Sequence, residues 1–111
     1  LLRPGMHVNA VGMHYPQTRE VDSATIQRAR VLVDDIPQCM LEKGELLIPI
    51  AQGAIGPDHV LGSLGALLAG RVEGRRSPDD ITLFGSSGTA LEYLAVADLL
   101  LQAAAVRARG P

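Results

Sequence analysis

The residues best suited to chemistry lie between His7 and Asp22, in the sequence HVNAVGMHYPQTREVD. The segment 7–11 predicts a strand that stops at Gly12, and a polar loop with His, Tyr, Gln, Thr and Arg side chains follows. In α/β proteins, ligands bind beyond the carboxyl ends of the strands. A glycine there lets a ligand approach the backbone, because it has no Cβ. The pattern fits a ligand crevice, although by itself it is more typical of an ordinary strand-to-helix loop.

The other candidate residues are more typical of structural roles than of catalytic or metal-binding ones. Ser86 and Ser87 could act as nucleophiles, but serines at such a position are far more often helix caps. The chain has three histidines, His7, His14 and His59. Their spacings match neither zinc fingers nor helical histidine pairs, so we expect no metal site. The single cysteine, Cys39, excludes an internal disulfide and is expected to be a small buried apolar residue of a cytoplasmic protein.

Composition excludes several classes of partner. Ten basic and twelve acidic residues leave a net charge of −2, and aromatic residues make up only 3% of the 111. Nucleic acid is therefore not an expected partner, because both a basic surface and base-stacking rings are lacking. The apolar segment 91–106 is interrupted by polar side chains, so we expect no membrane span. An apolar content of 47% is enough for one small core.

The first half of the chain predicts a strand–helix–strand unit. Asp22 or Ser23 caps a helix that runs through Arg30, and the apolar segment 31–33 forms a strand covered on both faces. The crossover between the two strands should be right-handed. The pair Asp34-Asp35 is interpreted as a cap for a helix over 36–43, which Gly44 would end.

The second half is less regular. Residues 46–48 fit a strand or a buried helix, and we interpret 45–57 as a loop over the sheet edge because Pro49 argues against a central strand. A helix is predicted from Asp58 through residue 69, then a surface loop over 71–80 and a strand over 81–84. A final helix reaches about residue 109. It is apolar on nearly all sides, so it would normally be buried, and this chain is too small to bury it.

Five segments together resemble the ornithine cyclodeaminase/mu-crystallin family: HVNAVG, TREVD, RVLVDD, EKGELLIPI and ITLFGSSGTALEYLAVADLL. The resemblance covers about residues 3–107 and only the C-terminal portion of a family member. It implies an α/β fold, with a partial Rossmann-type parallel sheet, flanking helices and a long C-terminal helix. Residues 1–88 would be the C-terminal part of an NAD(P)-binding domain. Residues 89–111 would lead towards the dimerisation domain of a homodimer.

The resemblance also implies site residues. It places contacts of NAD or NADP at Val11, Gly12, Met13, His14, Thr18 and Ser86, and a substrate contact at Ser87. His14 stands where ornithine cyclodeaminases carry their catalytic Asp, and Gly85 stands where Lys or Asp is common. The His14 departure argues against ornithine cyclisation and leaves open an imine reductase or an amino-acid dehydrogenase, with a small amino-acid or imine substrate.

Two parts of such an enzyme are missing from these residues. The sequence has no Gly-x-Gly-x-x-Gly loop for the pyrophosphate and none of the upstream basic residues that hold the substrate carboxylate. This piece alone is therefore expected to be inactive. The alternative is a non-catalytic, mu-crystallin-like protein that binds NADPH or another small ligand.

Overall fold

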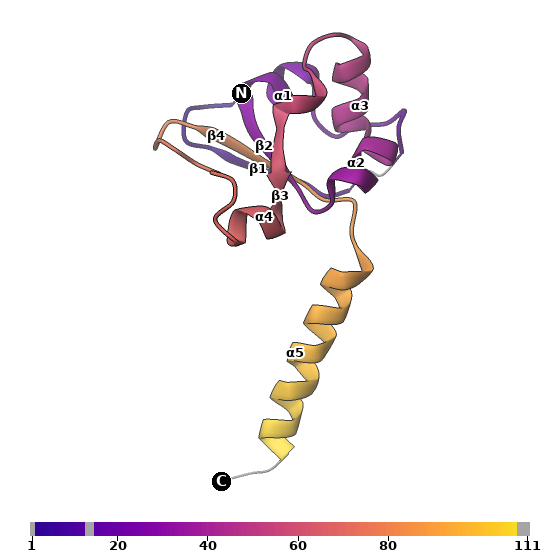
Figure 1. Cartoon of the computed structure of the whole chain (residues 1–111), viewed down its shortest axis with the longest axis vertical. Coiled ribbons are helices and arrows are strands. Elements are labelled where there is room, and N and C mark those ends of the chain that lie inside the picture. Colours follow the sequence, from indigo (N-terminus) through magenta and orange to yellow (C-terminus); the bar gives the residue numbers. More distant parts are fainter. Residues whose placement is uncertain (1, 13–14, 109–111) are drawn as a thin grey trace.

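The sheet consists of four short strands that pair in parallel, in the order β1-β4-β2-β3 (Figure 1). They are β1 (His7–Ala10), β2 (Ala29–Val33), β3 (Val60–Ser63) and β4 (Ile81–Gly85). The computed structural model describes residues 2–12 and 15–108. The two central strands, β2 and β4, are nearly continuous apolar runs, because both of their faces are covered. The predicted α/β class and the partial Rossmann-type parallel sheet are confirmed.

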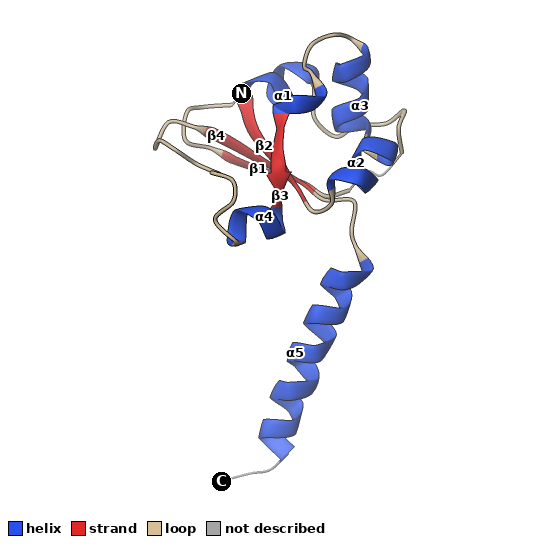
Figure 2. Cartoon of the chain, in the orientation of Figure 1, coloured by secondary structure: helices blue, strands red, loops and turns tan. Residues whose placement is uncertain are grey.

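The helices pack around this sheet. They are α1 (Ser23–Arg28), α2 (Ile36–Glu42), α3 (Gly44–Ala51), the 3₁₀ turn η1 (Pro57–His59), α4 (Leu64–Leu68) and α5 (Ala90–Ala108). Helix α3 contacts both α1 and α2, while α4 lies against β3 (Figure 2). The core at the centre of these contacts contains Ile26, Val31, Val33, Leu46 and Leu83, all at most 1% exposed.

The predicted starts of the helices are confirmed where a nearby side chain caps the helix. Asp22 accepts a hydrogen bond from the Thr25 amide at 2.8 Å, and Asp35 accepts one from the Gln38 amide at 2.8 Å. Such caps involve residues three apart, so they depend little on the rest of the fold. Helix α1 nevertheless ends at Arg28, two residues earlier than expected, because the next two residues already pair with β4.

The predicted helix from Asp58 through residue 69 is wrong. This segment forms η1, then β3, then α4, which begins after its cap Ser63. Pairing with β2 gives 60–63 an alternating burial pattern. The glycine at position 62 leaves room for the Val72 side chain, because a Cβ there would lie 3.0 Å from Val72 Cγ1. Sheet pairing has overridden a helical spacing of apolar residues.

The predicted loop over 45–57 is also wrong in its first half. Helix α3 occupies Gly44–Ala51, so residues 46–48 form the buried helix that was one of the two options. Gly44 starts this helix instead of ending α2, which stops at Glu42. Pro49 is tolerated within α3 at the cost of one backbone hydrogen bond.

Helix α5 projects away from the sheet, and all of its residues are exposed (Figure 1). The predicted extent of this helix is confirmed to within a few residues. Its exposure agrees with the expectation that the chain is too small to bury it. None of the helices formed by the described residues is both long and apolar enough to cross a membrane.

Candidate functional site

The carboxyl ends of β1 and β4 bring two predicted site segments together. Ala10 pairs with Gly85, and the Ser86 amide donates a hydrogen bond to the Ala10 carbonyl at 3.1 Å. Val11 and Gly12 therefore leave the sheet beside Ser86, although 74 positions separate residues 12 and 86 in the sequence. Both Val11 and Gly12 are exposed, and Val11 is 63% exposed. These residues lie beyond the carboxyl ends of parallel strands, which is where ligands bind in such sheets.

Asp34 joins this edge from the end of β2. Its Oδ2 atom accepts hydrogen bonds from Ser86 Oγ at 2.7 Å and from the amides of Ser87 and Gly88, both at 2.8 Å. Its Oδ1 atom accepts from the Asp35 amide at 2.9 Å and from Cys39 Sγ at 3.2 Å. The interpretation of Asp34 as a helix cap is therefore wrong, and Asp35 alone caps α2.

These hydrogen bonds determine the charge of Asp34. Partial burial acts to raise the pKa of its carboxyl. Hydrogen bonds from Ser86, Cys39 and the Asp35 and Gly88 amides outweigh burial and hold this pKa below its ordinary value of 3.8. A carboxylate that accepts several donors is stabilised in its ionised form. Asp34 is thus negatively charged at neutral pH.

Ser87 lies within this cluster. Its hydroxyl is 3.5 Å from Cys39 Sγ, so the predicted substrate contact faces α2. Burial raises the pKa of the Cys39 thiol to about 11, with Asp34 adding to the rise. Cys39 is therefore a neutral thiol near pH 7, as expected for a buried apolar residue, and has little nucleophilic character.

A buried ion pair contacts the loops at the same edge of the sheet. Lys43 and Glu45 are 1% and 0% exposed, and Lys43 Nζ lies 3.8 Å from Glu45 Oε2. Lys43 Nζ donates to the Ser86 carbonyl at 2.8 Å, and Glu45 Oε1 accepts from the Glu20 amide at 2.7 Å. Glu20 in turn accepts from the Gly12 amide at 2.8 Å. The pair therefore connects the loop after β1 to the loop after β4.

Gly85 makes room for this lysine. A Cβ at Gly85 would lie 2.9 Å from Lys43 Cε, which is closer than real Cβ contacts. The absence of a side chain at this position is therefore matched to the buried path of Lys43.

Sequence reasoning missed both Asp34 and the Lys43–Glu45 pair. The segment EKGE resembles a solvated helix end, and charged residues are rarely buried unless paired. The continuous apolar run before Asp34 did signal a strand end at the ligand edge, which was the available clue.

Of the remaining predicted site residues, Thr18 makes none of the hydrogen bonds described above for Asp34, Lys43 and Glu45. Thr18 Oγ1 donates to the Tyr15 carbonyl at 3.2 Å, and the Thr18 backbone lies against Gly44. Met13 and His14 lie outside the described residues. Within 2–12 and 15–108, no group of three or more His, Cys, Asp or Glu residues could hold a metal ion.

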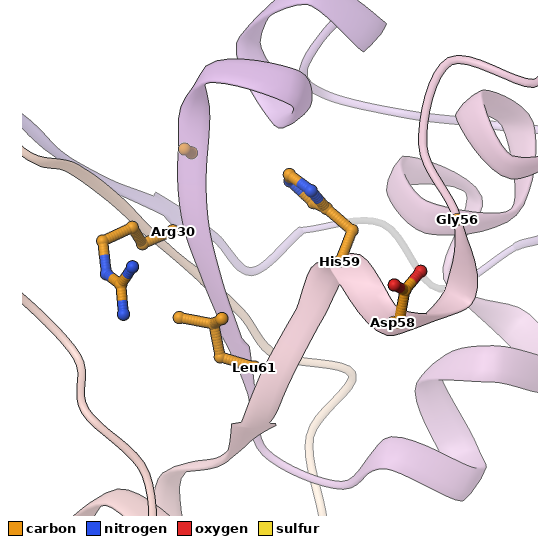
Figure 3. A pocket seen from close by; sticks show the side chains of 6 residues that line it. Arg30, Gly56, Asp58, His59 and Leu61 are labelled. Carbon is orange, nitrogen blue, oxygen red and sulfur yellow. The ribbon is translucent and has the colours of Figure 1, made fainter.

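A cavity of about 460 Å³ lies at the opposite end of the sheet (Figure 3). It is lined by Ala29, Arg30, Gly56, Asp58, His59 and Leu61. Arg30 donates to the Glu73 carbonyl at 2.9 Å, and His59 Nε2 lies 2.8 Å from the Ile26 carbonyl. Arg30 thus joins β2 to the loop before β4, and His59 joins η1 to α1. The cavity lies where β2 and β3 begin, away from the edge that carries Ser86, so it does not form part of the candidate site.

Comparison with known proteins identifies the relatives of this chain. A model of the ornithine cyclodeaminase/mu-crystallin family matches residues 1–106. The delta(1)-pyrroline-2-carboxylate reductase of Colwellia psychrerythraea is 41% identical over 98 residues, which are 88% of this chain and 31% of that protein. The alanine dehydrogenase of Archaeoglobus fulgidus is 35% identical over 98 residues, which are 88% of this chain and 30% of that protein.

Solved structures share the fold. That of Thermococcus litoralis delta(1)-pyrroline-2-carboxylate reductase, in complex with NADH and L-proline, matches with a TM-score of 0.88 and 34% identity, over 96% of this chain and 33% of that one. An archaeal alanine dehydrogenase dimer with bound NAD matches with a TM-score of 0.81 and 33% identity, over 96% of this chain and 33% of that one. The chain thus spans about a third of the length of these relatives.

Proposed function

Since this chain belongs to the ornithine cyclodeaminase/mu-crystallin family, we propose that it is the C-terminal part of an NAD(P)-dependent oxidoreductase of amino-acid metabolism. The reaction is hydride transfer between the nicotinamide and an amino-acid or imine carbon. In this proposal, residues 1–88 complete a Rossmann-type domain, and residues 89–111 lead towards the dimerisation domain of a homodimer.

One observation carries the proposal: the loops after β1 and β4 meet at the carboxyl edge of the sheet. Ser86 donates its amide hydrogen to Ala10, which places it beside Val11 and Gly12. The residues there suit a nicotinamide, which presents a flat apolar face and a polar carboxamide. Val11 offers exposed apolar surface, Gly12 carries no obstructing side chain, and Ser86 offers a hydroxyl. Solved relatives with this fold hold NADH or NAD.

The pyrophosphate end of the cofactor has no counterpart in these residues, because the sequence lacks a Gly-x-Gly-x-x-Gly loop. Helix N-terminal amides in such a loop normally hold the pyrophosphate. We therefore propose that residues 1–111 contribute the nicotinamide side of the site only. Calorimetric titration of this chain with NADH and NADPH should show weak binding or none, and micromolar affinity would contradict this division.

His14 is the proposed acid/base group. When bound, the nicotinamide supplies the hydride that adds to the carbon of a C=N bond, and the nitrogen then needs a proton. An imidazole is suited to hold and deliver that proton near neutral pH. His14 follows Gly12 by two positions in the sequence and belongs to the predicted set of cofactor contacts, with Thr18 and Met13 as further proposed contacts.

The test uses the complete protein that contains this chain. We expect NAD(P)H-dependent reduction of a small cyclic or linear imino acid, and a decrease in turnover of about 10²–10⁴-fold in His14→Ala. The dissociation constant of the dinucleotide should change little. His7→Ala is the matched control, because His7 lies at the amino end of β1, and it should retain turnover.

Two outcomes would contradict the proposal in different ways. Turnover within a few-fold of the unaltered protein in His14→Ala would exclude the proton-transfer role of this residue. Tight dinucleotide binding without turnover on any imino or amino acid would favour the non-catalytic, ligand-binding alternative.

A further inference from the structure

We infer that Asp34 is a positioning residue of this site: it holds residues 86–88 in place and leaves the Ser86 hydroxyl able only to accept a hydrogen bond from a ligand. The inference rests on the proposed function for the identity of that ligand. It rests on the observed hydrogen bonds alone for the positioning of the loop.

The Asp34 carboxylate contacts the loop at three consecutive residues. Its Oδ2 atom accepts from Ser86 Oγ, the Ser87 amide and the Gly88 amide at 2.7–2.8 Å. Gly88 has φ of +78°, a left-handed backbone conformation that glycine adopts readily. A turn of this shape directs successive amides towards one point, and an ionised carboxylate is a strong acceptor for them. Asp34 therefore determines where the chain after β4 lies.

The same contact determines the hydrogen-bonding capacity of Ser86. A serine hydroxyl has one hydrogen to donate and two lone pairs. Its hydrogen is donated to Asp34, and one lone pair accepts from the Gly88 amide at 3.0 Å. One lone pair remains, so Ser86 can bind a ligand only through an N–H or O–H group of that ligand.

This capacity selects the chemistry of the ligand. The carboxamide of a nicotinamide carries an amino group, which can donate to the remaining lone pair, and a carbonyl, which cannot. We therefore expect Ser86 to bind the amino side of the carboxamide. A ligand that presents a methyl group at this position would lose that hydrogen bond.

The first experiment measures loop positioning without any ligand. In Asp34→Asn, an NH₂ group, which cannot accept a hydrogen bond, replaces one of the two carboxylate oxygens. If it takes the place of Oδ2, it faces the three donors of residues 86–88. If it takes the place of Oδ1, the hydrogen bonds from the Asp35 amide and Cys39 are lost. Exchange of the Ser87 and Gly88 amide hydrogens, followed by NMR, should become about tenfold faster or more. Asp35→Asn is the matched control, since Asn caps helices as well as Asp and should leave these amides protected.

A second measurement covers the case in which Asp34→Asn does not fold. In the unaltered chain, the amide proton shifts of Ser87 and Gly88 should titrate in acid with the same midpoint as the Asp34 carboxyl carbon. Shifts that do not follow Asp34, or equal exchange rates in Asp34→Asn and Asp35→Asn, would overturn the positioning role.

The third experiment tests the capacity of Ser86, in the complete protein. NAD⁺ is compared with 3-acetylpyridine adenine dinucleotide, in which a methyl group replaces the carboxamide NH₂. We expect the unaltered protein to bind NAD⁺ about tenfold more tightly, and Ser86→Ala to abolish most of this preference. A preference that persists unchanged in Ser86→Ala would overturn the acceptor role.

These readouts distinguish failure of the proposed function from failure of the positioning role of Asp34. If Asp34→Asn exposes the Ser87 and Gly88 amides but the complete protein binds neither NAD⁺ nor NADP⁺, the proposed function fails while the positioning role of Asp34 stands. If the dinucleotides bind and the amides are unaffected, the cofactor binding that the proposed function requires stands and the inference fails.

Discussion

Replacing Gly44 with alanine should displace the loop that carries Thr18. Gly44 is the first residue of α3, and its Cα faces the backbone of residues 15–18. A Cβ there would overlap the Thr18 carbonyl oxygen and lie 2.8 Å from the Tyr15 carbonyl oxygen. Both are backbone atoms, so neither can move aside by a side-chain rotation. The loop would have to retreat by more than about one ångström to restore van der Waals contact.

The expected cost follows from this clash. Overpacking of a well-packed site typically costs about 1–3 kcal/mol, and the rigid neighbours of Gly44 argue for the upper part of this range. Alanine regains about 0.4–1 kcal/mol by restricting the unfolded chain. The net change in the free energy of unfolding is therefore a loss of about 1–2 kcal/mol. At a urea slope of about 1 kcal/mol per molar for a small domain, the midpoint should fall by about 1–2 M.

Gly65→Ala provides the matched control. Gly65 also lies in a helix, α4, but a Cβ at this position would have Ser63 Oγ as its nearest neighbour, at 3.9 Å. This variant should gain about 0.4–1 kcal/mol, so the two glycine-to-alanine changes should shift the urea midpoint in opposite directions. If Gly44→Ala raised the midpoint as Gly65→Ala does, the close approach of the 15–18 loop to α3 would be refuted.

Three further predictions concern charge and exposed apolar surface. Glu45→Gln should lower the free energy of unfolding by about 3–5 kcal/mol, because it removes a buried carboxylate that lies beside the buried Lys43 ammonium. Glu42→Gln in the same segment should change little in denaturant titrations. The pKa of Asp34 is lowered by folding, so its stabilising effect is complete above the ordinary value of 3.8 and disappears as the pH falls through the folded value. Asp34→Asn should therefore flatten the loss of stability below about pH 4 in acid titrations. Helix α5 should drive self-association of this chain, and Leu94→Gln with Leu101→Gln should reduce it in sedimentation velocity; a monodisperse monomer of the unaltered chain would contradict this.

Local sequence was sufficient for the elements that local interactions define. The caps at Asp22 and Asp35 bond to amides three residues ahead, and the helix after Thr89 begins where expected. The apolar runs of β2 and β4 identified two central strands. The segment 58–69 was mispredicted because its apolar spacing suits a helix, while its pairing partner β2 lies about thirty residues earlier in the sequence.

For the candidate site, the sequence by itself determined that polar loops follow apolar strands at Gly12 and Ser86, and its resemblance to a known family associated both with a cofactor. Only the tertiary structure decided what holds these loops. Asp34 reaches the loop after β4 because β4 lies between β1 and β2, an order that no local period encodes. Lys43 and Glu45 likewise bond to segments more than twenty residues away. A sequence pattern predicts that charged side chains near a helix end are solvated. Here distant segments bury Lys43 and Glu45, which then bind the two loops of the candidate site.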